Sequence, residues 1–233
     1  MNILETRGLT RHFGGLKAVE DVDFDLAPGE IHALIGPNGA GKTTFVGLIC
    51  GRLRPDRGTI RFDGRDITRL PAHARVRLGI AYTFQITSIY PRLPVYDNVA
   101  LAVQRSGAPD LTSGAFAALG RVGLENRARD TAGTLAYGHQ RLLEIAMGLA
   151  LRPRLLILDE PTQGLAPGEI DAFKTLVRDV ASTATVLLIE HNMDVVMDLA
   201  QRITVLNFGA KLATGAPAAI RADPAVRAAY LGP

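Results

Sequence analysis

Residues 31–44 read Ile31-His-Ala-Leu-Ile-Gly-Pro-Asn-Gly-Ala-Gly-Lys-Thr-Thr44. The first five are mostly apolar and predict a short buried strand. The run from Gly36 to Gly41 interrupts that strand, and the apolar segment after it predicts a helix that Gly51 ends. This order of elements matches the pattern G-x-x-x-x-G-K-[ST], which binds the phosphates of a purine nucleoside triphosphate. The alternative, a glycine-rich turn that carries a lysine by chance, does not explain the flanking strand and helix.

The loop predicts a role for each part. Its backbone N–H groups and the helix N-terminus would surround phosphate oxygens. Lys42 would reach the β- and γ-phosphates, and the Thr43 hydroxyl would bind Mg²⁺. The predicted nucleotide-binding residues of the loop are Gly36, Pro37, Asn38, Gly39, Ala40, Gly41, Lys42, Thr43 and Thr44.

A second motif is the run Leu155-Leu-Ile-Leu-Asp-Glu160. A buried strand that ends in a carboxylate places Asp159 where it can hold Mg²⁺ through water. Glu160 could then polarise the attacking water as a general base. Alone, such a sequence is usually a solvated strand end. Together with the phosphate loop, it predicts a P-loop nucleoside triphosphatase.

Composition restricts the remaining interpretations. Of 233 residues, 47% are hydrophobic and 21% charged, which excludes intrinsic disorder as the main interpretation. The formal net charge of +3 is too small to predict a nucleic-acid partner. The single cysteine, Cys50, cannot form an internal disulfide, which fits a reducing compartment. We expect no secretion signal and no membrane span, because no apolar run reaches about 18 residues.

Hydrophobic patterns predict the other elements. Residues 2–35 predict strands, Asp63-Gly64 predicts a hairpin turn, and Asn207-Phe-Gly-Ala210 predicts a further turn. Residues 88–151 are rich in Ala and Leu at helical spacing and predict an inserted helical lobe.

Strand and helix signals alternate in the second half of the chain, which predicts an α/β fold with parallel strands. Strands are predicted over residues 155–158, 185–189 and 203–206. The helix between the first two has an apolar face of Ile170, Phe173, Leu176, Val177 and Val180. We expect one domain, residues 1–233, with a core of residues 1–87 and 152–216, a helical subdomain of residues 88–151 and a helical tail of residues 217–233.

Three further segments are similar to motifs of the ATP-binding cassette (ABC) ATPases, and the resemblance covers nearly the whole chain. They are Tyr82-Thr-Phe-Gln85, Ile189-Glu-His191 and Phe13 in Arg11-His-Phe-Gly-Gly15. The resemblance implies that Gln85 senses the γ-phosphate and Mg²⁺, that His191 contacts the γ-phosphate, and that Phe13 stacks on adenine. It also implies a RecA-like core with an N-terminal antiparallel β subdomain and an inserted helical subdomain. Taken alone, Gln85 and His191 could be surface residues and Phe13 a core aromatic.

The resemblance completes the predicted site. The cofactors are ATP and Mg²⁺. The predicted catalytic residues are Lys42, Gln85, Glu160 and His191, and the predicted metal-binding residues are Thr43, Gln85 and Asp159.

The signature segment departs from the usual family pattern Leu-Ser-Gly-Gly-Gln. Here it is Leu135, Ala136, Tyr137, Gly138 and His139. In the family this segment contacts the ATP of the opposite subunit, so one serine hydroxyl is missing from that contact. The segment is similar to one branch of the family, the ATPase subunits of branched-chain amino acid importers.

Other segments are similar to the same branch: Pro94-Val-Tyr-Asp-Asn98, Glu190-His-Asn-Met193 and Ala229-Tyr-Leu-Gly232. Ala166 stands where many cassettes have an aspartate that couples the two sites, and the run Gly164-Leu-Ala-Pro167 also occurs in this branch.

The resemblance predicts an energy-coupling subunit of an importer for branched-chain amino acids or related amino acids and amides. It implies a head-to-tail dimer with a second ATPase subunit, either a copy or a paralogue. It also implies two membrane permease subunits that dock near residues 85–100. A periplasmic or extracellular substrate-binding protein would be an indirect partner. The expected location is peripheral, at the cytoplasmic face of the inner membrane.

Three alternatives stay open at this point. They are a cassette for lipid or lipopolysaccharide export, a soluble ABC protein of translation or DNA repair, and a non-catalytic module in which ATP only regulates assembly.

Overall fold

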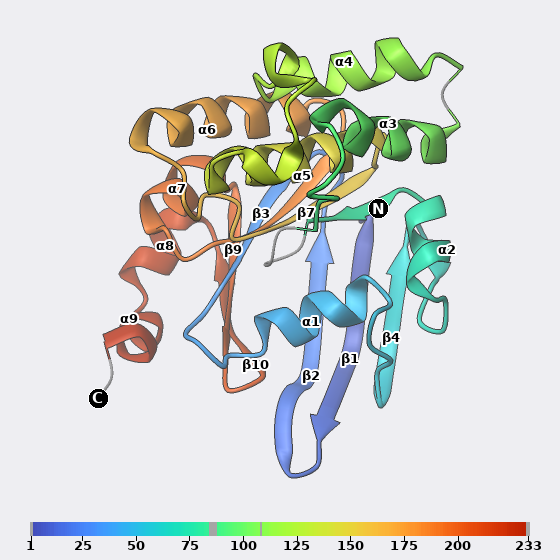
Figure 1. Cartoon of the computed structure of the whole chain (residues 1–233). Coiled ribbons are helices and arrows are strands. Elements are labelled where there is room, and N and C mark those ends of the chain that lie inside the picture. The colour runs from blue at the N-terminus through green and yellow to red at the C-terminus, as the bar shows by residue number, and fades with distance from the viewer. Residues whose placement is uncertain (1, 84–87, 108, 232–233) are drawn as a thin grey trace. The chain divides into compact units, whose positions relative to one another are not determined.

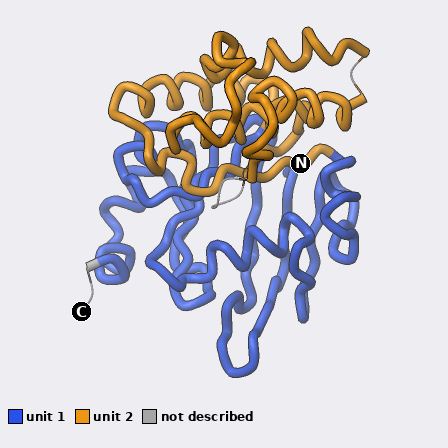
Figure 2. The backbone as a smooth tube through the Cα atoms, in the orientation of Figure 1, with its two compact units in different colours: residues 1–78, 185–233 blue, residues 79–184 orange. Residues whose placement is uncertain are grey.

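The structure, a computed structural model, describes residues 2–83, 88–107 and 109–231 (Figure 1). Its chain divides into two units (Figure 2). Unit 1 contains residues 1–78 and 185–233, and unit 2 contains residues 79–184. Unit 2 thus includes the helical segment 88–151, the strand before it, and the strand and the helix after it.

Unit 1 contains an antiparallel sheet in the order β2-β1-β4-β5. Its turn residues Asp63 and Gly64 both have positive φ angles, 51° and 74°, which is the geometry of a two-residue hairpin. The predicted strands at the N-terminus and the predicted hairpin are both confirmed. The strands are β1 (Leu4–Phe13), β2 (Leu16–Leu26), β4 (Arg57–Phe62) and β5 (Arg65–Asp66).

The second sheet of unit 1 has β3 at its centre. β3 pairs in parallel with β8 on one side and β9 on the other, and β9 pairs with β10 in antiparallel fashion. All five residues of β3 are buried, as are those of β8, which is typical of parallel strands covered on both faces. The strands are β3 (Ile31–Ile35), β8 (Thr185–Ile189), β9 (Arg202–Asn207) and β10 (Ala210–Gly215), and the helices of this unit are α1 (Lys42–Ile49), α2 (Ala72–Arg77), α7 (Met193–Leu199), α8 (Pro217–Ala222) and α9 (Pro224–Leu231).

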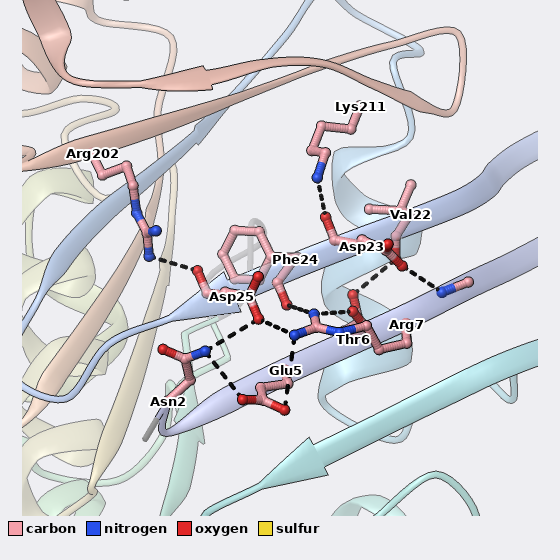
Figure 3. A network of polar contacts seen from close by, with 11 residues as sticks. Asn2, Glu5, Thr6, Arg7, Val22, Asp23, Phe24, Asp25, Arg202 and Lys211 are labelled. Carbon is pink, nitrogen blue, oxygen red and sulfur yellow. Dashed lines mark hydrogen bonds and ion pairs between the residues drawn. The ribbon is translucent and has the colours of Figure 1, made fainter.

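Polar contacts connect the two sheets of unit 1 (Figure 3). Arg202 of β9 donates to the Asp25 carbonyl oxygen at 2.8 Å, and Lys211 of β10 donates to that of Asp23 at 2.7 Å. Arg202 also forms an ion pair with Glu30 at 2.8 Å. Burial raises the pKa of Glu30, but hydrogen bonds from His32 and Arg202 outweigh it and lower the pKa to about 2. Glu30 and Arg202 therefore form a charged pair at the N-terminal end of β3.

Unit 2 contains a parallel strand pair and four longer helices in its described part. β6 pairs with β7 from Ile80↔Leu155 to Tyr82↔Ile157. The predicted apolar face of α6 is buried at four of its five positions, with Ile170 half-buried. The elements are β6 (Ile80–Tyr82), β7 (Leu155–Asp159), α3 (Val95–Ser106), α4 (Leu111–Arg121), α5 (Tyr137–Ala150), α6 (Pro167–Ala181) and the 3₁₀ turns Glu125–Arg127 and Ala132–Thr134. None of the helices in the described residues has the length and apolar character needed to cross a membrane.

Candidate nucleotide-binding site

The phosphate loop, residues 36–43, leaves the carboxyl end of β3 and enters α1. Two of its glycines lie directly against backbone atoms. A Cβ at Gly36 would lie 2.2 Å from the Leu206 carbonyl oxygen, and one at Gly41 would lie 2.2 Å from that of Ala18. Gly41 also has a φ of 99°, which other residues adopt only at a cost. Contacts with β9 and β2 therefore fix the course of the loop.

The Lys42 ammonium group lies over this loop. Its Nζ atom donates to the carbonyl oxygens of Gly36 at 2.6 Å and Pro37 at 3.0 Å. α1 begins at Gly41 without a side-chain cap and has no acidic residue in its first turn. The uncapped start of α1 and the Lys42 ammonium group thus lie at the same loop, an arrangement that suits a phosphate anion.

The turn between β9 and β10 attaches the loop to β2. The Gly209 N–H donates to the Ala40 carbonyl oxygen at 3.1 Å, and the Gly209 carbonyl accepts from the Glu20 N–H at 2.8 Å. Phe208, at the tip, is 86% exposed and has a φ of 46°. The sequence predicts a turn here but not its attachment to the phosphate loop, which depends on residues far apart in the chain.

His191 follows β8, the strand paired in parallel with β3. The register aligns Leu34 with Ile189, so His191 leaves the sheet at the same edge as the phosphate loop. The buried Glu190 carboxylate accepts from the backbone N–H groups of His191 at 2.9 Å and Asn192 at 3.1 Å. The His191 side chain itself is 68% exposed. Glu190 therefore positions this turn, a role that the sequence analysis did not assign.

Phe13 ends β1, opposite Leu16. Its side chain is 43% exposed, so it is not a core aromatic. The Arg11 guanidinium lies 4.8 Å from the ring centroid and forms a cation–π contact with it. Phe13, the phosphate loop and His191 all belong to unit 1.

Asp159 and Glu160 stand at the carboxyl end of β7 in unit 2. Asp159 is 2% exposed, and its Oδ2 atom accepts from the Tyr82 hydroxyl at 2.7 Å. Glu160 has a φ of 49°, a strained conformation of the kind found at functional sites. The buried Arg141 donates to the Asp159 carbonyl oxygen at 2.8 Å. Tyr82 and Arg141 are thus positioning residues, and the sequence analysis gave neither of them a role.

The signature segment forms the N-terminus of α5. Leu135 is buried, and Ala136 occupies the N-cap position without a side-chain cap. Tyr137 is 44% exposed. Gly138 packs closely, because a Cβ there would lie 3.0 Å from the Gly164 carbonyl oxygen. The segment is therefore packed against the turn that precedes α6.

His139 is held from both sides. Arg127 donates to its Nδ1 atom at 2.9 Å, and its Nε2 atom lies 3.3 Å from the Glu169 carboxylate. This assigns the proton of a neutral ring to Nε2. Glu169 also accepts from the Ala166 N–H at 2.7 Å. One carboxylate thus connects the signature segment with the start of α6, and the sequence analysis missed this role.

The predicted site residues are distributed over both units. Unit 1 holds Phe13, the phosphate loop and His191, and unit 2 holds Asp159, Glu160 and the signature segment. Gln85, predicted as a sensor and metal-binding residue, lies outside the described residues. A parallel sheet whose central strand opens into a glycine-rich loop and helix, with a further parallel strand that ends in Asp-Glu, defines a P-loop nucleoside triphosphatase.

Comparison with known proteins identifies the family. The sequence pattern of the ABC transporter family matches residues 19–163, and that of the "branched-chain amino acid ATP-binding cassette transporter" family matches residues 210–232. The chain therefore belongs to the ATP-binding subunits of ABC transporters, and it is an ATP-binding ATPase of that family.

Similar proteins match over the full length of the chain. The high-affinity branched-chain amino acid transport ATP-binding protein BraF of Pseudomonas aeruginosa is 42% identical, over 99% of this chain and 98% of the relative. LivG of Escherichia coli K12, which carries the same description, is 39% identical over the same shares. The crystal structure of the ADP conformation of MJ1267, an ATP-binding cassette of an ABC transporter, superposes with a TM-score of 0.90 at 29% identity and covers 100% of both chains.

Proposed function

We propose that this protein is the energy-coupling ATPase of an importer for branched-chain amino acids or related amino acids and amides. The observation that carries the proposal is the full-length similarity to branched-chain amino acid transport ATP-binding proteins, at 42% and 39% identity. The match of residues 210–232 to a family described by the same substrate class supports it independently.

ATP binds at the phosphate loop in this proposal. Lys42 moves from the carbonyl oxygens of Gly36 and Pro37, where it donates at 2.6 and 3.0 Å, to the β- and γ-phosphates. The backbone N–H groups of residues 39–44 bind the phosphate oxygens, and the exposed ring of Phe13 stacks on adenine. The cation–π contact with Arg11 keeps that ring in position.

The residues present fit Mg²⁺ as a cofactor. Thr43 and Asp159 provide hard oxygen atoms, and Gln85 is the further predicted ligand. The described residues include no group of three or more His, Cys, Asp or Glu side chains that could form a metal site without a substrate. Mg²⁺ commonly completes its coordination with substrate phosphates and water. When bound, it neutralises charge on the transferring phosphoryl group.

Hydrolysis depends on Glu160 and His191. Glu160 accepts a proton from the attacking water as a general base, and its strained backbone holds the carboxylate in a defined direction. His191 contacts the γ-phosphate, and the Glu190 carboxylate keeps the turn that carries it in place. Arg141 and Tyr82 hold Asp159 at the strand end.

A second cassette completes each site. Residues 135–139 contact the ATP of the opposite subunit through the N-terminus of α5, in a head-to-tail dimer. Ala136 provides no hydroxyl, so the contact consists of backbone N–H groups and the fixed His139. The partner cassette is a second copy or a paralogue. Two membrane permeases dock near residues 85–100 and hold the protein at the cytoplasmic face of the inner membrane, while a periplasmic or extracellular protein delivers the substrate.

Gentle extraction of the tagged protein from its own host's membranes tests the proposal. We expect it to co-purify with two polytopic proteins and a similar ATPase, and its deletion to abolish uptake of radiolabelled leucine, isoleucine or valine. Recovery without any membrane protein would contradict the transport function. Recovery with permeases but unchanged amino acid uptake would contradict only the substrate class.

A further inference from the structure

A cavity of about 310 Å³ lies in unit 1, where helix α7 and the C-terminal helices α8 and α9 meet the end of β3 (Figure 1). This volume is in the range of sites for small molecules. Ile35, Ile220 and Val226 give the cavity an apolar wall, since they are at most 6% exposed and belong to one core cluster. Met193 and Met197 of α7 also line it and pack against that cluster. The cavity is therefore suited to an apolar group.

Three charged residues, one from each helix, line the same cavity. They are Asp194 of α7, Arg221 of α8 and Arg227 of α9, and all three are exposed. Arg227 donates through its Nε atom to the Arg221 carbonyl oxygen at 3.1 Å. Among residues 2–83, 88–107 and 109–231, no side chain forms an ion pair with any of the three. Two guanidinium groups and one carboxylate are thus available to a ligand.

An apolar wall with charges of both signs beside it matches a free amino acid that has an apolar side chain. The carboxylate of such a solute can accept two parallel hydrogen bonds from one guanidinium group. Its ammonium group can pair with Asp194, and its side chain can contact the apolar wall. Methionine side chains adapt to differently branched partners, because they are unbranched and flexible. A simple cation is disfavoured, since two arginines and one aspartate give the cavity a net positive charge.

We propose that this cavity binds a free amino acid with an apolar side chain, of the class that the proposed importer delivers. The choice of occupant rests on the proposed function, whereas the cavity and its charges do not depend on it. None of the residues that line the cavity is a predicted nucleotide-binding residue. Because Ile35 is the last residue of β3 and directly precedes Gly36, the occupant contacts the strand end from which the phosphate loop leaves.

Methionine methyl groups report on the cavity directly. The chain has four methionines, of which Met193 and Met197 line the cavity, whereas Met147 belongs to α5 of unit 2. The experiment places carbon-13 methyl labels on the methionines of the purified full-length chain and adds L-leucine. We expect the NMR signals of Met193 and Met197 to shift along a saturable curve while the Met147 signal stays in place. Unchanged Met193 and Met197 signals up to the solubility limit of leucine would overturn the site.

Two analogues of leucine separate the contributions of its charged groups. Leucinamide lacks the carboxylate, and 4-methylpentanoate lacks the ammonium group. Each should bind about 10-fold more weakly than leucine, the loss expected for one hydrogen bond to a charged group. An affinity equal to that of leucine for either analogue would overturn the assignment of a free amino acid as the occupant.

Substitution of both arginines tests the charged contacts. Combined Arg221→Gln and Arg227→Gln should raise the Kd for leucine by about 10-fold. Combined Arg65→Gln and Arg77→Gln is the matched control, because these arginines are exposed in the same unit, outside the cavity, and the change in charge is the same. The control should leave the Kd unchanged. Equal Kd values in the two double variants would overturn the role of the guanidinium groups.

Failure of this site and failure of the proposed importer are distinguishable. The chain could co-purify with permeases and be required for leucine uptake, while leucine leaves the Met193 and Met197 signals unchanged. That result would overturn only the cavity site. Leucine could instead shift these signals in a chain that is recovered without any membrane protein. That result would support the binding site and overturn the importer.

Discussion

The phosphate loop of unit 1 and the signature segment of unit 2 are both helix N-termini without a side-chain cap, yet they are held in different ways. The loop lies against carbonyl oxygens of β2 and β9, so close that a Cβ at Gly41 would overlap Ala18. The signature segment is held by side chains, since His139 contacts both Arg127 and Glu169.

This difference explains why one motif keeps the usual family pattern and the other does not. Backbone contacts leave no room for a side chain, so the loop requires glycine at fixed positions. Side-chain contacts can be replaced by other contacts of similar shape and charge. His139 stands where the family usually has glutamine. Its Nδ1 atom contacts Arg127 and its Nε2 atom contacts Glu169, so both ring nitrogens have a partner.

The largest expected effect is a loss of ATP hydrolysis on changing Glu160 of unit 2, without a loss of ATP binding at the phosphate loop of unit 1. Glu160→Gln keeps the shape of the side chain but removes the base, so kcat should fall by about 10²- to 10⁴-fold while ATP binding at the loop persists. ATPase assays and equilibrium binding measure the two quantities. Glu125→Gln, an exposed change in the same unit, serves as the control. Turnover by Glu160→Gln near the wild-type rate would remove Glu160 as the base.

Alanine at the two motif glycines tests the difference between backbone and side-chain support. Gly41→Ala combines a positive φ with a Cβ only 2.2 Å from the Ala18 carbonyl oxygen and should cost about 3 kcal/mol of unfolding free energy. Gly138→Ala meets its neighbours at 3.0 Å and should cost about 1 kcal/mol. Gly168→Ala, in open space on α6, should be neutral or stabilise by about 0.5 kcal/mol. Denaturant titration orders the three, and equal costs at Gly41 and Gly138 would contradict the comparison.

Acid should destabilise unit 1 at the start of β3, where Glu30 pairs with Arg202. The folded-state pKa of Glu30 is about 2, below its ordinary value of 4.5, so its stabilisation is complete above pH 4.5 and is lost as the pH falls through about 2. Glu30→Gln should cost about 2 kcal/mol at pH 7. The difference from the wild type should vanish near pH 2, measured by urea titration across this range. A cost that does not depend on pH would show that packing, not charge, explains it.

The smallest expected effect concerns the signature side. Glu169→Gln removes the anion beside His139 but keeps an acceptor for the Ala166 N–H, so it should cost about 0.5–1 kcal/mol, since the pair is partly exposed. ATPase activity of the assembled dimer should fall while nucleotide binding by the single chain does not. Asp171→Asn on the same helix, whose side chain is 78% exposed, is the matched control. A loss of nucleotide binding in the single chain would contradict the assignment of Glu169 to the signature side.

Local sequence patterns predicted most of the strands, helices and turns. The apolar runs of β3, β7 and β8, the glycine run after β3 and the Asp63-Gly64 turn each depend on neighbouring residues only, and all appear in the structure as predicted. Residues that act over long separations could not be found in this way. Glu30 and Arg202 are 172 positions apart, and a charged residue gives no local sign that it will be buried beside a particular partner.

Local order was thus readable from the amino-acid sequence: which segments are strands and helices, and where glycine is required between them. These features depend on backbone conformation and apolar periodicity, which neighbouring residues impose. Tertiary structure alone decided how those residues are held. The bond from Gly209 to Ala40, the hold of Arg141 on Asp159 and the Arg127–His139–Glu169 chain arise only when folding brings distant groups within about 3 Å of one another, the range in which hydrogen bonds and ion pairs form.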